Sequence, residues 1–405
     1  MAKSLDPALA GPRTLAVHAG ERPDPETGAS SPNLVMSSTF VTDGPEGFSA
    51  SELTEDSPFV YTRWANPTVR QLEQKVAALE GAEAASAFAS GMAAGHAILM
   101  AELSAGDHFV LSEVCYAGIA ELARDTLPRF GVAVTPVDTS DLDALRAAMR
   151  PETKLVFIDT PCNPLMRLTD IAGAAEIAHA NGARLMVDST FASPAGTRPL
   201  SLGADYVMHS ATKYIGGHGD AVGGMVCGAA DLIRPLVSEA IVHYGGVMSP
   251  FNAWLIARGA ATLPLRMAAH QETAMAVAAW LEADPRVARV NYPGLASHPQ
   301  HNLAGRQMQN FSAMLSFQVK GGEAEGTAIA NRMGERLGLI HYAVSLGHHR
   351  SLICWMPTAS LLETSFRLEG DGAERYRDWA GDGLFRLSVG LEDPADLIRD
   401  LDQVL

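Results

Sequence analysis

Short apolar runs alternate with segments of helical periodicity through the middle of the chain. The runs SAFAS, HFVLSE, VAVTPVD, KLVFIDT, RLMVDST and DYVMHS have the length and residue types of buried strands. Between them lie segments typical of helices, among them the stretches from Ile119 to Phe130, from Asp141 to Met149 and from Thr169 to Ala180. This alternation predicts an α/β fold with a mostly parallel sheet flanked by helices. Ligands of such a sheet bind at the carboxyl ends of its strands.

The pattern changes twice along the chain, and these changes predict three parts. Residues 1–63 are rich in Pro, Gly, Ser and Thr with little periodicity, which is typical of an extended arm. Residues 64–262 carry the α/β alternation, beginning with a helix that starts at Asn66 and ends at Gly81. Residues 263–405 begin with a long helical segment and continue with strand-like AMLSFQVK and LFRLSVG, which predicts a smaller C-terminal α+β domain.

Composition narrows the class of protein. The 405 residues carry 30 Lys and Arg against 46 Asp and Glu, a net charge of −16, whereas nucleic acids and anionic membranes bind basic surfaces. No apolar run approaches the roughly 20 residues of a membrane span, and the first residues lack the apolar core of a signal peptide, so we expect a cytoplasmic protein. The four cysteines form no CxxC pair, which favours free thiols.

One lysine stands out because of its surroundings. Lys213 follows the strand-like run ADYVMH in the sequence SATKYIGGH, so we expect it on a loop at the end of a strand. An amine fixed there suits a Schiff base with an aldehyde cofactor, and the hydroxyls of Ser210 and Thr212 suit an attached phosphate. Most lysines are solvated surface residues, and that alternative applies to Lys213 taken alone.

Three other strand ends carry residues that fit the same chemistry. Asp188 ends the run RLMVD and either caps a turn or pairs with a protonated ring nitrogen. Ser90, Gly91 and Met92 lie between a strand and a helix of small residues, where free N–H groups bind an anion; a plain helix cap is the alternative. Tyr116 opens another strand-to-helix turn and offers a flat ring and a phenol, with a buried core tyrosine as the alternative.

Two arginines complete the set of candidates. In FRLSV the apolar residues share one face of a strand, so Arg386 shares the other face with Ser388. That position suits a substrate carboxylate unless the side chain faces solvent. Arg63 lies beside Tyr61 on the loop before the first helix, where an arginine suits phosphate capture across a subunit interface. An ordinary surface position is the alternative for this pair.

Six blocks follow one another along the chain: YTRWANPT, AFASGMAA, TPCNPLMRLTDI, VDSTFASP, SATKYIGGHGDAVGG and LFRLSVGLEDPADLI. In this order they resemble the Cys/Met-metabolism family of pyridoxal-phosphate enzymes, which includes cystathionine γ-synthase, cystathionine γ-lyase, methionine γ-lyase and the O-acylhomoserine sulfhydrylases. The resemblance runs from about Thr14 to the C-terminus, and six ordered blocks are far more specific than any single one. It implies the fold-type I architecture of these transferases, pyridoxal 5'-phosphate as cofactor, and a homotetramer built from dimers with shared active sites.

The resemblance also assigns roles to individual positions. Lys213 resembles the lysine that holds the cofactor and then carries protons, and Asp188 resembles the partner of the ring nitrogen. Tyr116 resembles the tyrosine that stacks on the ring and acts as acid or base on the leaving group. The other matches are the phosphate cradle (Gly91, Met92, Ser210 and Thr212, beside Ser90), the pair that reaches a neighbouring subunit's phosphate (Tyr61 and Arg63), the residue near the cofactor's phenolic oxygen (Asn163) and the carboxylate clamp (Arg386 and Ser345).

For the reaction, the resemblance implies γ-elimination by a γ-lyase on a C4 amino acid with a sulfur- or oxygen-linked leaving group. The first alternative is γ-replacement, as in cystathionine γ-synthase or an O-acylhomoserine sulfhydrylase, and a canavanine γ-lyase is a further one. The sequence leaves these open, because they differ in whether a nucleophile reaches the reaction intermediate before it collapses. A dehydrogenase is disfavoured because GGHGDAVGG precedes a strand-like run rather than a helix. A catalytically silent module is disfavoured because Lys213, Asp188 and Arg386 are all present.

The chain departs from the family pattern where the substrate is recognised. After Ser345-Leu346-Gly347 the family usually places a glutamate three residues on, but this chain has His348-His349-Arg350. We therefore expect Arg350 to contact the distal part of the substrate and to favour an acidic group, unless its side chain turns away. Adjacent histidines on an extended segment point in opposite directions, so no metal site is expected. The stretch SFRLEGDGAERYRDWAGDG is also longer than the usual connection.

Overall fold

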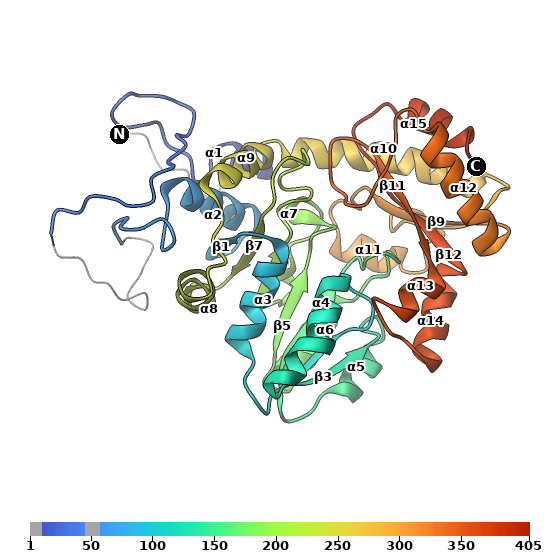
Figure 1. Cartoon of the computed structure of the whole chain (residues 1–405), viewed down its shortest axis with the longest axis horizontal. Coiled ribbons are helices and arrows are strands. Elements are labelled where there is room, and N and C mark those ends of the chain that lie inside the picture. Colours follow the sequence, from blue (N-terminus) through green and yellow to red (C-terminus); the bar gives the residue numbers. More distant parts are fainter. Residues whose placement is uncertain (1–9, 45–56) are drawn as a thin grey trace.

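Seven strands form the larger of two sheets: β1 (Ala84–Phe88), β2 (His108–Ser112), β3 (Ala133–Val137), β4 (Thr153–Asp159), β5 (Arg184–Asp188), β6 (Tyr206–His209) and β7 (Gly224–Gly228). This computed structural model, which describes residues 10–44 and 57–405, arranges them in the order β1-β7-β6-β5-β4-β2-β3 (Figure 1). β7 runs antiparallel to both of its neighbours, and every other pair is parallel. The predicted, mostly parallel sheet is confirmed.

Helices cover both faces of this sheet. One apolar cluster is shared with α2 (Pro67–Glu80), α5 (Leu142–Ala148), α6 (Ile171–Ala180), α7 (Ser193–Gly196), η5 (Pro199–Leu202) and α9 (Pro250–Ala260). A second cluster is shared with α3 (Gly91–Glu102), α4 (Ala117–Glu121), η3 (Leu122–Thr126), η4 (Leu127–Phe130), α8 (Ala230–Leu236) and η6 (Val237–His243). Val110 of β2 belongs to the first cluster, whereas its neighbours Phe109 and Leu111 belong to the second. Burial on both faces explains why the strands read as continuous apolar runs.

The segment predicted as one helix from Ile119 to Phe130 is helical but irregular. α4 gives way to a π-helical turn in η3 and to a 3₁₀ turn in η4. Pro128 has no N–H to donate to the fourth carbonyl before it, so a regular α-helix cannot continue through it. The helix predicted between Asn66 and Gly81 begins and ends as expected, with the Asn66 side chain accepting from two backbone N–H groups.

The arm predicted for residues 1–63 is not extended throughout. Pro12–His18 form the short helix α1, which packs against α2. Lys75 of α2 is fully buried beside it, donates to the carbonyl oxygen of Ala16 at 2.6 Å and pairs with Glu21 at 2.9 Å. Packing rather than intrinsic propensity therefore stabilises this short helix. Residues 1–9 and 45–56 of the predicted arm lie outside the described residues.

The C-terminal part begins with α10 (Leu263–Ala283), which runs along the top of Figure 1 toward the smaller sheet. Its other elements are β8 (Val287–Asn291), α11 (His301–Gln307), β9 (Met314–Val319), α12 (Gly322–Arg336), β10 (His341–Tyr342), β11 (Leu352–Pro357), α13 (Thr358–Glu363), α14 (Gly370–Ala380), β12 (Gly383–Ser388) and α15 (Pro394–Asp402). The five strands follow the order β10-β11-β12-β9-β8, antiparallel except for β10 and β11. A separate sheet with its own helices agrees with the predicted α+β part, and the boundaries at 63 and 262 stay predictions.

Helices α13 and α14 join the two sheets, and α14 lies in the unusually long segment noted in the sequence. Phe366 and Tyr376 share an apolar cluster with Val114, which follows β2. Arg375 of α14 donates to both carboxylate oxygens of Glu113, at 3.1 and 2.7 Å. The long segment thus fixes the C-terminal part against the loop that leads to Tyr116.

Candidate active site

Lys213 lies on a tight turn that follows β6, as its sequence context predicts. Its N–H donates to the carbonyl oxygen of Ser210 at 3.0 Å, and its own carbonyl accepts from Gly217 at 2.7 Å. The buried guanidinium of Arg266, from α10, donates to the carbonyl oxygens of Tyr214 and Ile215 at 2.9 and 3.2 Å. The backbone on either side of Lys213 is therefore held in place, which fixes the point from which its side chain leaves.

The amine of Lys213 reaches the C-terminal part of the chain. Its Nζ donates to Oγ of Ser345 at 2.8 Å. Burial, and then the nearby cation of Arg386, lower the pKa of Lys213 to about 8. An amine with this pKa loses its proton far more readily than an ordinary lysine, and the neutral amine is the form that attacks a carbonyl or removes a proton.

The segment that carries Ser345 presses against the backbone of Lys213. Ser345 has a φ of +87°, a conformation that residues with side chains rarely adopt. A Cβ placed on Gly347 would lie 2.6 Å from the backbone nitrogen of Tyr214, so only glycine allows this approach. The N–H of Gly347 donates to Oγ of Ser388 at 2.9 Å. These contacts keep the Ser345 hydroxyl within reach of Lys213.

Arg386 lies in β12, between β11 and β9, and is only 8% exposed. Its Nη1 donates to Oδ1 of Asn163 at 2.9 Å, and its Nη2 donates to the carbonyl oxygen of Ser345 at 3.2 Å. No carboxylate among residues 10–44 and 57–405 forms an ion pair with it. A buried guanidinium with neutral partners suits a carboxylate that arrives with a ligand. The alternative of a solvent-facing arginine is wrong.

Two buried carboxyl groups lie at neighbouring strand ends. Asp159 and Asp188 are paired in register at the ends of β4 and β5, and both are at least nine-tenths buried. Burial raises the pKa of Asp188, and burial together with the Asp188 charge raises the pKa of Asp159. Asp188 also accepts a hydrogen bond from the N–H of Thr190 at 2.9 Å. It therefore caps a turn, which was one of the two roles considered for it from the sequence. A cation such as a protonated ring nitrogen would stabilise the charge of this pair.

The loops after β1 and β6 form a small, tight corner. Ser90 caps α3 by accepting the N–H of Ala93 at 3.1 Å. A Cβ placed on Gly91 would lie 2.9 Å from the Cβ of Ser210, so these two loops touch. The hydroxyl of Thr212 is bonded to the backbone of Gly223 and so shapes the loop itself. N–H groups in the first turn of a helix suit an anion, so the start of α3 is a candidate site for a phosphate.

Tyr116 directly precedes α4 and is 48% exposed, so the alternative of a buried core tyrosine is wrong. Its backbone N–H donates to Oδ2 of Asp159 at 2.9 Å. A Cβ placed on Gly118 would lie 2.9 Å both from Cε1 of Tyr116 and from the sulfur of Met92. The start of α3 and Tyr116 therefore lie at the same edge of the sheet, at which β5 also ends, with Asp188 as its last residue.

These residues fit pyridoxal phosphate. The cofactor needs an amine for its aldehyde, an anion for its ring nitrogen, N–H and hydroxyl donors for its phosphate, and a flat ring to stack against. All four needs are met at the carboxyl edge of one sheet. The amine is that of Lys213, the anion is the buried Asp188, the donors lie where Ser90 meets Ser210, and the flat ring is that of Tyr116.

Three predicted residues lie apart from this group. No hydrogen bond or ion pair in the described part of the chain joins Tyr61 or Arg63 to Lys213. Arg63 instead lies over the ring of Tyr61, 5.2 Å from its centroid, and donates to the carbonyl oxygen of Val242. Arg350 is exposed, and its Nε donates to Nε2 of His349 at 3.2 Å.

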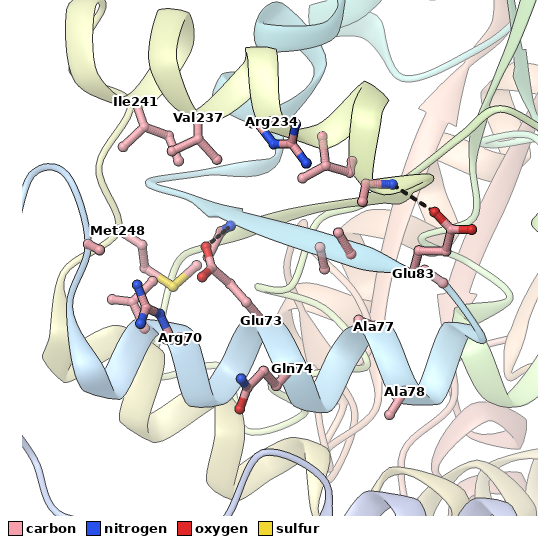
Figure 2. A pocket seen from close by; sticks show the side chains of 18 of the residues that line it. Arg70, Glu73, Gln74, Ala77, Ala78, Glu83, Arg234, Val237, Ile241 and Met248 are labelled. Atoms are coloured by element: carbon pink, nitrogen blue, oxygen red, sulfur yellow. Dashed lines mark hydrogen bonds between the residues drawn. The ribbon is translucent and has the colours of Figure 1, made fainter. Parts of the chain in front are cut away.

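A cavity of about 900 Å³ lies elsewhere, between α2, β1 and the helices α8 and η6 (Figure 2). Its lining includes Arg70, Ala77, Val237 and Ile241, and none of the predicted site residues. Within residues 10–44 and 57–405, no group of three His, Cys, Asp or Glu side chains is placed to hold a metal, and no helix is long and apolar enough to cross a membrane. The cysteines are all buried and unpaired.

Comparisons with known proteins bear on the whole chain. Residues 13–405 match the family model described as Cys/Met metabolism PLP-dependent enzyme. The chain belongs to this family. The chain is 42% identical over 400 residues to a canavanine γ-lyase of Pseudomonas canavaninivorans, covering 97% of this chain and 95% of that protein. It is 44% identical over 388 residues to an O-succinylhomoserine sulfhydrylase of Pseudomonas aeruginosa, covering 96% and 93%.

The fold agrees with a solved relative. The crystal structure of metB from Corynebacterium glutamicum superposes with a TM-score of 0.89 at 38% identity, covering 99% of both chains. Family membership confirms three expectations from the sequence: the fold class, an enzyme, and dependence on pyridoxal phosphate.

Sequence reasoning missed two residues that contact this site, Asp159 and Arg266, and did not predict the direction of a third, His348. Asp159 holds the backbone of Tyr116, and a signal was present, because the apolar runs KLVFID and RLMVD both end in aspartate. Arg266 lies 53 positions after Lys213, in the first turn of α10, where no local pattern marks it. His348 was noted as a departure from the family, but its direction was not predicted; its Nε2 lies 3.5 Å from Oγ of Ser345.

Proposed function

We propose that this chain is a pyridoxal-phosphate-dependent γ-lyase that eliminates a sulfur- or oxygen-linked group from the γ-carbon of a C4 amino acid. The observation that carries the proposal is the hydrogen-bonded set Lys213, Ser345, Arg386 and Asn163, in which an amine and a buried guanidinium bind the same residue, Ser345. The amine would carry protons, and the guanidinium would bind a carboxylate. Membership of the family and the similarity to a canavanine γ-lyase support it.

Pyridoxal phosphate, when bound through Lys213, supplies an electron-withdrawing ring that makes the substrate's carbon-bound protons acidic. Asp188 would hold the ring nitrogen in its protonated form. The phosphate would lie at the start of α3, surrounded by Ser90, Gly91, Met92, Ser210 and Thr212.

The protein's own groups would then orient the substrate and move its protons. Arg386 would bind the substrate carboxylate, and its bond to Asn163 fixes the plane of the guanidinium. Lys213, displaced from the cofactor, would remove the α-proton and then a proton from the β-carbon, because its lowered pKa favours the neutral amine. Tyr116, half exposed at the mouth of the site, would give a proton to the departing γ-group.

γ-Replacement is the second candidate, supported by the similarity to an O-succinylhomoserine sulfhydrylase. The same residues would serve it, with a thiol or sulfide adding where the leaving group departed. A canavanine γ-lyase is the third candidate and is a special case of the first. Arg350 would favour an acidic distal group in any of these substrates, provided that its side chain swings from His349 into the site.

The active unit in this proposal is a dimer, assembled into a cytoplasmic homotetramer. Within the described residues of one chain, neither Tyr61 nor Arg63 forms a hydrogen bond to Lys213. This supports the proposal that the two residues contact the cofactor phosphate of a neighbouring subunit. Their guanidinium and phenol ring lie together on the segment before α2, so they would approach that phosphate as a pair.

A substrate panel on the purified protein tests the reaction. Each substrate is assayed for release of 2-oxobutanoate and ammonia, with and without added sulfide or cysteine. The substrates are methionine, cystathionine, homocysteine, canavanine and the O-acylhomoserines. Oxo-acid release without a nucleophile establishes a γ-lyase and identifies its leaving group. Turnover only with a nucleophile, giving a new amino acid, moves the chain to the transferases, and homoserine formed from canavanine points to water as the acceptor. Unchanged turnover in Lys213→Ala would refute the assignment altogether.

A further inference from the structure

Two carboxyl groups lie side by side at the carboxyl edge of the large sheet, and only one of them has a role in the proposed function. Asp159 ends β4 and Asp188 ends β5, and the two residues are paired in register on these parallel strands. Phe157 and Met186, two positions earlier on each strand, belong to the same apolar cluster. Because residues two positions apart on a strand share a face, both carboxyl groups project from the same face of the sheet. Neighbouring strands lie about 4.8 Å apart, so the two groups are close neighbours.

Neither carboxyl group is solvated or neutralised by a cation. Asp159 is 5% exposed and Asp188 is 6% exposed. Among residues 10–44 and 57–405, no Lys, Arg or His side chain forms an ion pair with either of them. Two carboxylates that share a buried site repel each other strongly, so one of the two retains a proton near neutral pH.

The surroundings decide which group retains that proton. Burial raises the pKa of Asp188, but hydrogen bonds from Thr190 and the charge of His209 lower it. Burial and then the charge of Asp188 raise the pKa of Asp159, and only two backbone hydrogen bonds oppose them. Asp188 therefore has a cation nearby, whereas Asp159 has an anion nearby. Both influences place the negative charge on Asp188 and the proton on Asp159.

The other titratable groups around the pair do not alter this assignment. His209, the last residue of β6, is bonded through Nε2 to Oε2 of Glu80 in α2 at 3.0 Å. The thiols of Cys115 and Cys162, on the loops after β2 and β4, are buried. Burial raises the pKa of both thiols, for Cys162 to about 12. Both thiols are therefore neutral and add no charge to the site.

We propose that Asp159 is a positioning residue of the cofactor site, which keeps its proton so that Asp188 carries the only negative charge of the pair. One anion matches the single positive charge of a protonated ring nitrogen, so the buried charges are balanced when the cofactor is bound. The neutral carboxyl group also accepts a hydrogen bond at Oδ2 from the backbone N–H of Tyr116, at 2.9 Å, directly before α4. Asp159 acts through Asp188 and Tyr116 rather than on the substrate. This inference rests on the roles that the proposed function gives to those two residues.

Infrared spectroscopy of the cofactor-free protein tests whether the pair holds a proton. The carbonyl band of a protonated carboxyl group is separate from the bands of carboxylates, so one such group can be followed in a difference spectrum. Near neutral pH, Asp159→Asn should lack one protonated-carboxyl band that the wild-type protein has. A difference spectrum without that band would overturn the proposal.

Cofactor affinity shows which of the two residues carries the charge. Pyridoxal 5'-phosphate is titrated into each cofactor-free protein and its binding is followed by visible absorbance. Asp159→Asn replaces a neutral acid with a neutral amide of the same shape, so the dissociation constant should stay within about threefold of the wild-type value. Asp188→Asn, the matched control, makes the same change at the paired position but removes the anion, and should weaken binding about tenfold or more. Equal weakening by both variants, or weakening by neither, would overturn the proposal.

The contact with Tyr116 is tested by two substitutions at one position. Asp159→Ala removes the acceptor of the Tyr116 N–H and should lower kcat about tenfold or more, with a smaller effect on KM. Asp159→Asn keeps a carbonyl oxygen as acceptor and should restore most of kcat. A wild-type kcat for Asp159→Ala would overturn the positioning role. If the wild-type protein turned over no γ-substituted substrate, the proposed function would fail, but the infrared spectra and the cofactor titrations would still decide the charge of Asp159.

Discussion

The guanidinium of Arg386 donates a hydrogen bond to the side-chain oxygen of Asn163 at 2.9 Å, and this bond crosses from the smaller sheet to the larger one. Arg386 lies in β12 of the C-terminal sheet, whereas Asn163 follows β4 of the other. The guanidinium proposed to bind the substrate carboxylate and the loop that carries Asn163 are therefore oriented together. A shift of one part relative to the other would move the clamp away from Lys213.

Replacing Arg386 should weaken substrate binding more than cofactor binding. A hydrogen bond to a charged group is worth about 1.5–3 kcal/mol, so we expect Arg386→Ala to lower kcat/KM by roughly 10²-fold, mainly through KM. Arg386→Lys keeps the charge but loses the planar fork, and should recover only part of this loss. Steady-state kinetics, with the visible absorbance of the bound cofactor as a control for loading, measure both. A variant with an unchanged KM would remove Arg386 from substrate binding.

The lowered pKa of Lys213 makes a prediction for the cofactor-free protein. The neutral amine is the reactive form, so its labelling by an amine reagent should be half-maximal near pH 8, the pKa that burial and Arg386 produce. Arg386→Gln removes the second cause and should shift the midpoint upward. Peptide mass spectrometry measures this at Lys213, with the exposed Lys154 and Lys320 as internal comparisons. A midpoint at the ordinary value of a lysine, near 10.4, would show that the amine is not desolvated.

The paired carboxyl groups predict a pH-dependent stability. Because the pKa of Asp159 is raised in the folded protein, the folded state binds a proton that the unfolded state has already lost above about pH 4. The contribution of Asp159 to the free energy of unfolding therefore falls as the pH rises from about 4 through the raised pKa of Asp159 in the folded protein. Asp159→Asn keeps an acceptor for the Tyr116 N–H and removes the charge, so it should raise the melting temperature of the cofactor-free protein at pH 7.5.

The advantage of Asp159→Asn should shrink toward pH 4, where both proteins carry a neutral side chain. It should also shrink in the holoenzyme, because the cofactor's ring nitrogen would offset the Asp188 charge. Asp141→Asn, at the exposed cap of α5, is the control, since asparagine caps a helix as well as aspartate. A lower melting temperature for Asp159→Asn at pH 7.5 would mean that its hydrogen bonds outweigh the buried charge.

The strand ends of the large sheet could be predicted because parallel strands buried on both faces are continuous apolar runs, and polar residues mark where they stop. Asp188 ends such a run, Ser90 follows another closely, and Lys213 lies on the loop that follows a third. Arg266 could not be found in this way, because it acts on the carbonyls of Tyr214 and Ile215 through a contact made only in the folded chain.

Two local features were also beyond sequence reasoning. α1 arises in a segment broken by prolines and depends on packing against α2, so periodicity could not reveal it. The contacts of the Ser345 hydroxyl with Lys213 and with His348 are made by a segment in which Ser345 has a positive φ, a conformation that no sequence pattern marked.

A buried ion cluster beside Tyr116 predicts an unequal effect of two mutations. Glu113 is almost fully buried and lies between Arg375, at 2.7 Å, and the buried Arg167, at 3.7 Å. Glu113→Ala leaves Arg167 with less compensation and should lower the free energy of unfolding by about 3 kcal/mol. Arg375→Ala removes a partly exposed partner and should cost under about 1 kcal/mol. Urea titration measures both, and equal losses would contradict a cluster centred on Arg167.

Mixing two inactive variants tests the shared active site proposed for Tyr61 and Arg63. If Arg63 serves the neighbouring subunit, Arg63→Ala and Lys213→Ala are each inactive as homodimers, but a mixed dimer holds one intact site. That site has Lys213 from the first chain and Arg63 from the second. After subunit exchange in mild denaturant, random pairing in equal amounts should restore about a quarter of wild-type activity.

The matched control for this exchange uses two residues that act in the same site of one chain. Lys213→Ala mixed with Arg386→Ala gives dimers in which every site lacks one of the two residues, so activity should not return. The tetramer gives the same expectation, because each site still depends on one pair of chains. Recovery in the control would mean that Arg386 also acts across the interface. No recovery with Arg63→Ala, despite verified exchange, would return Tyr61 and Arg63 to an ordinary surface position.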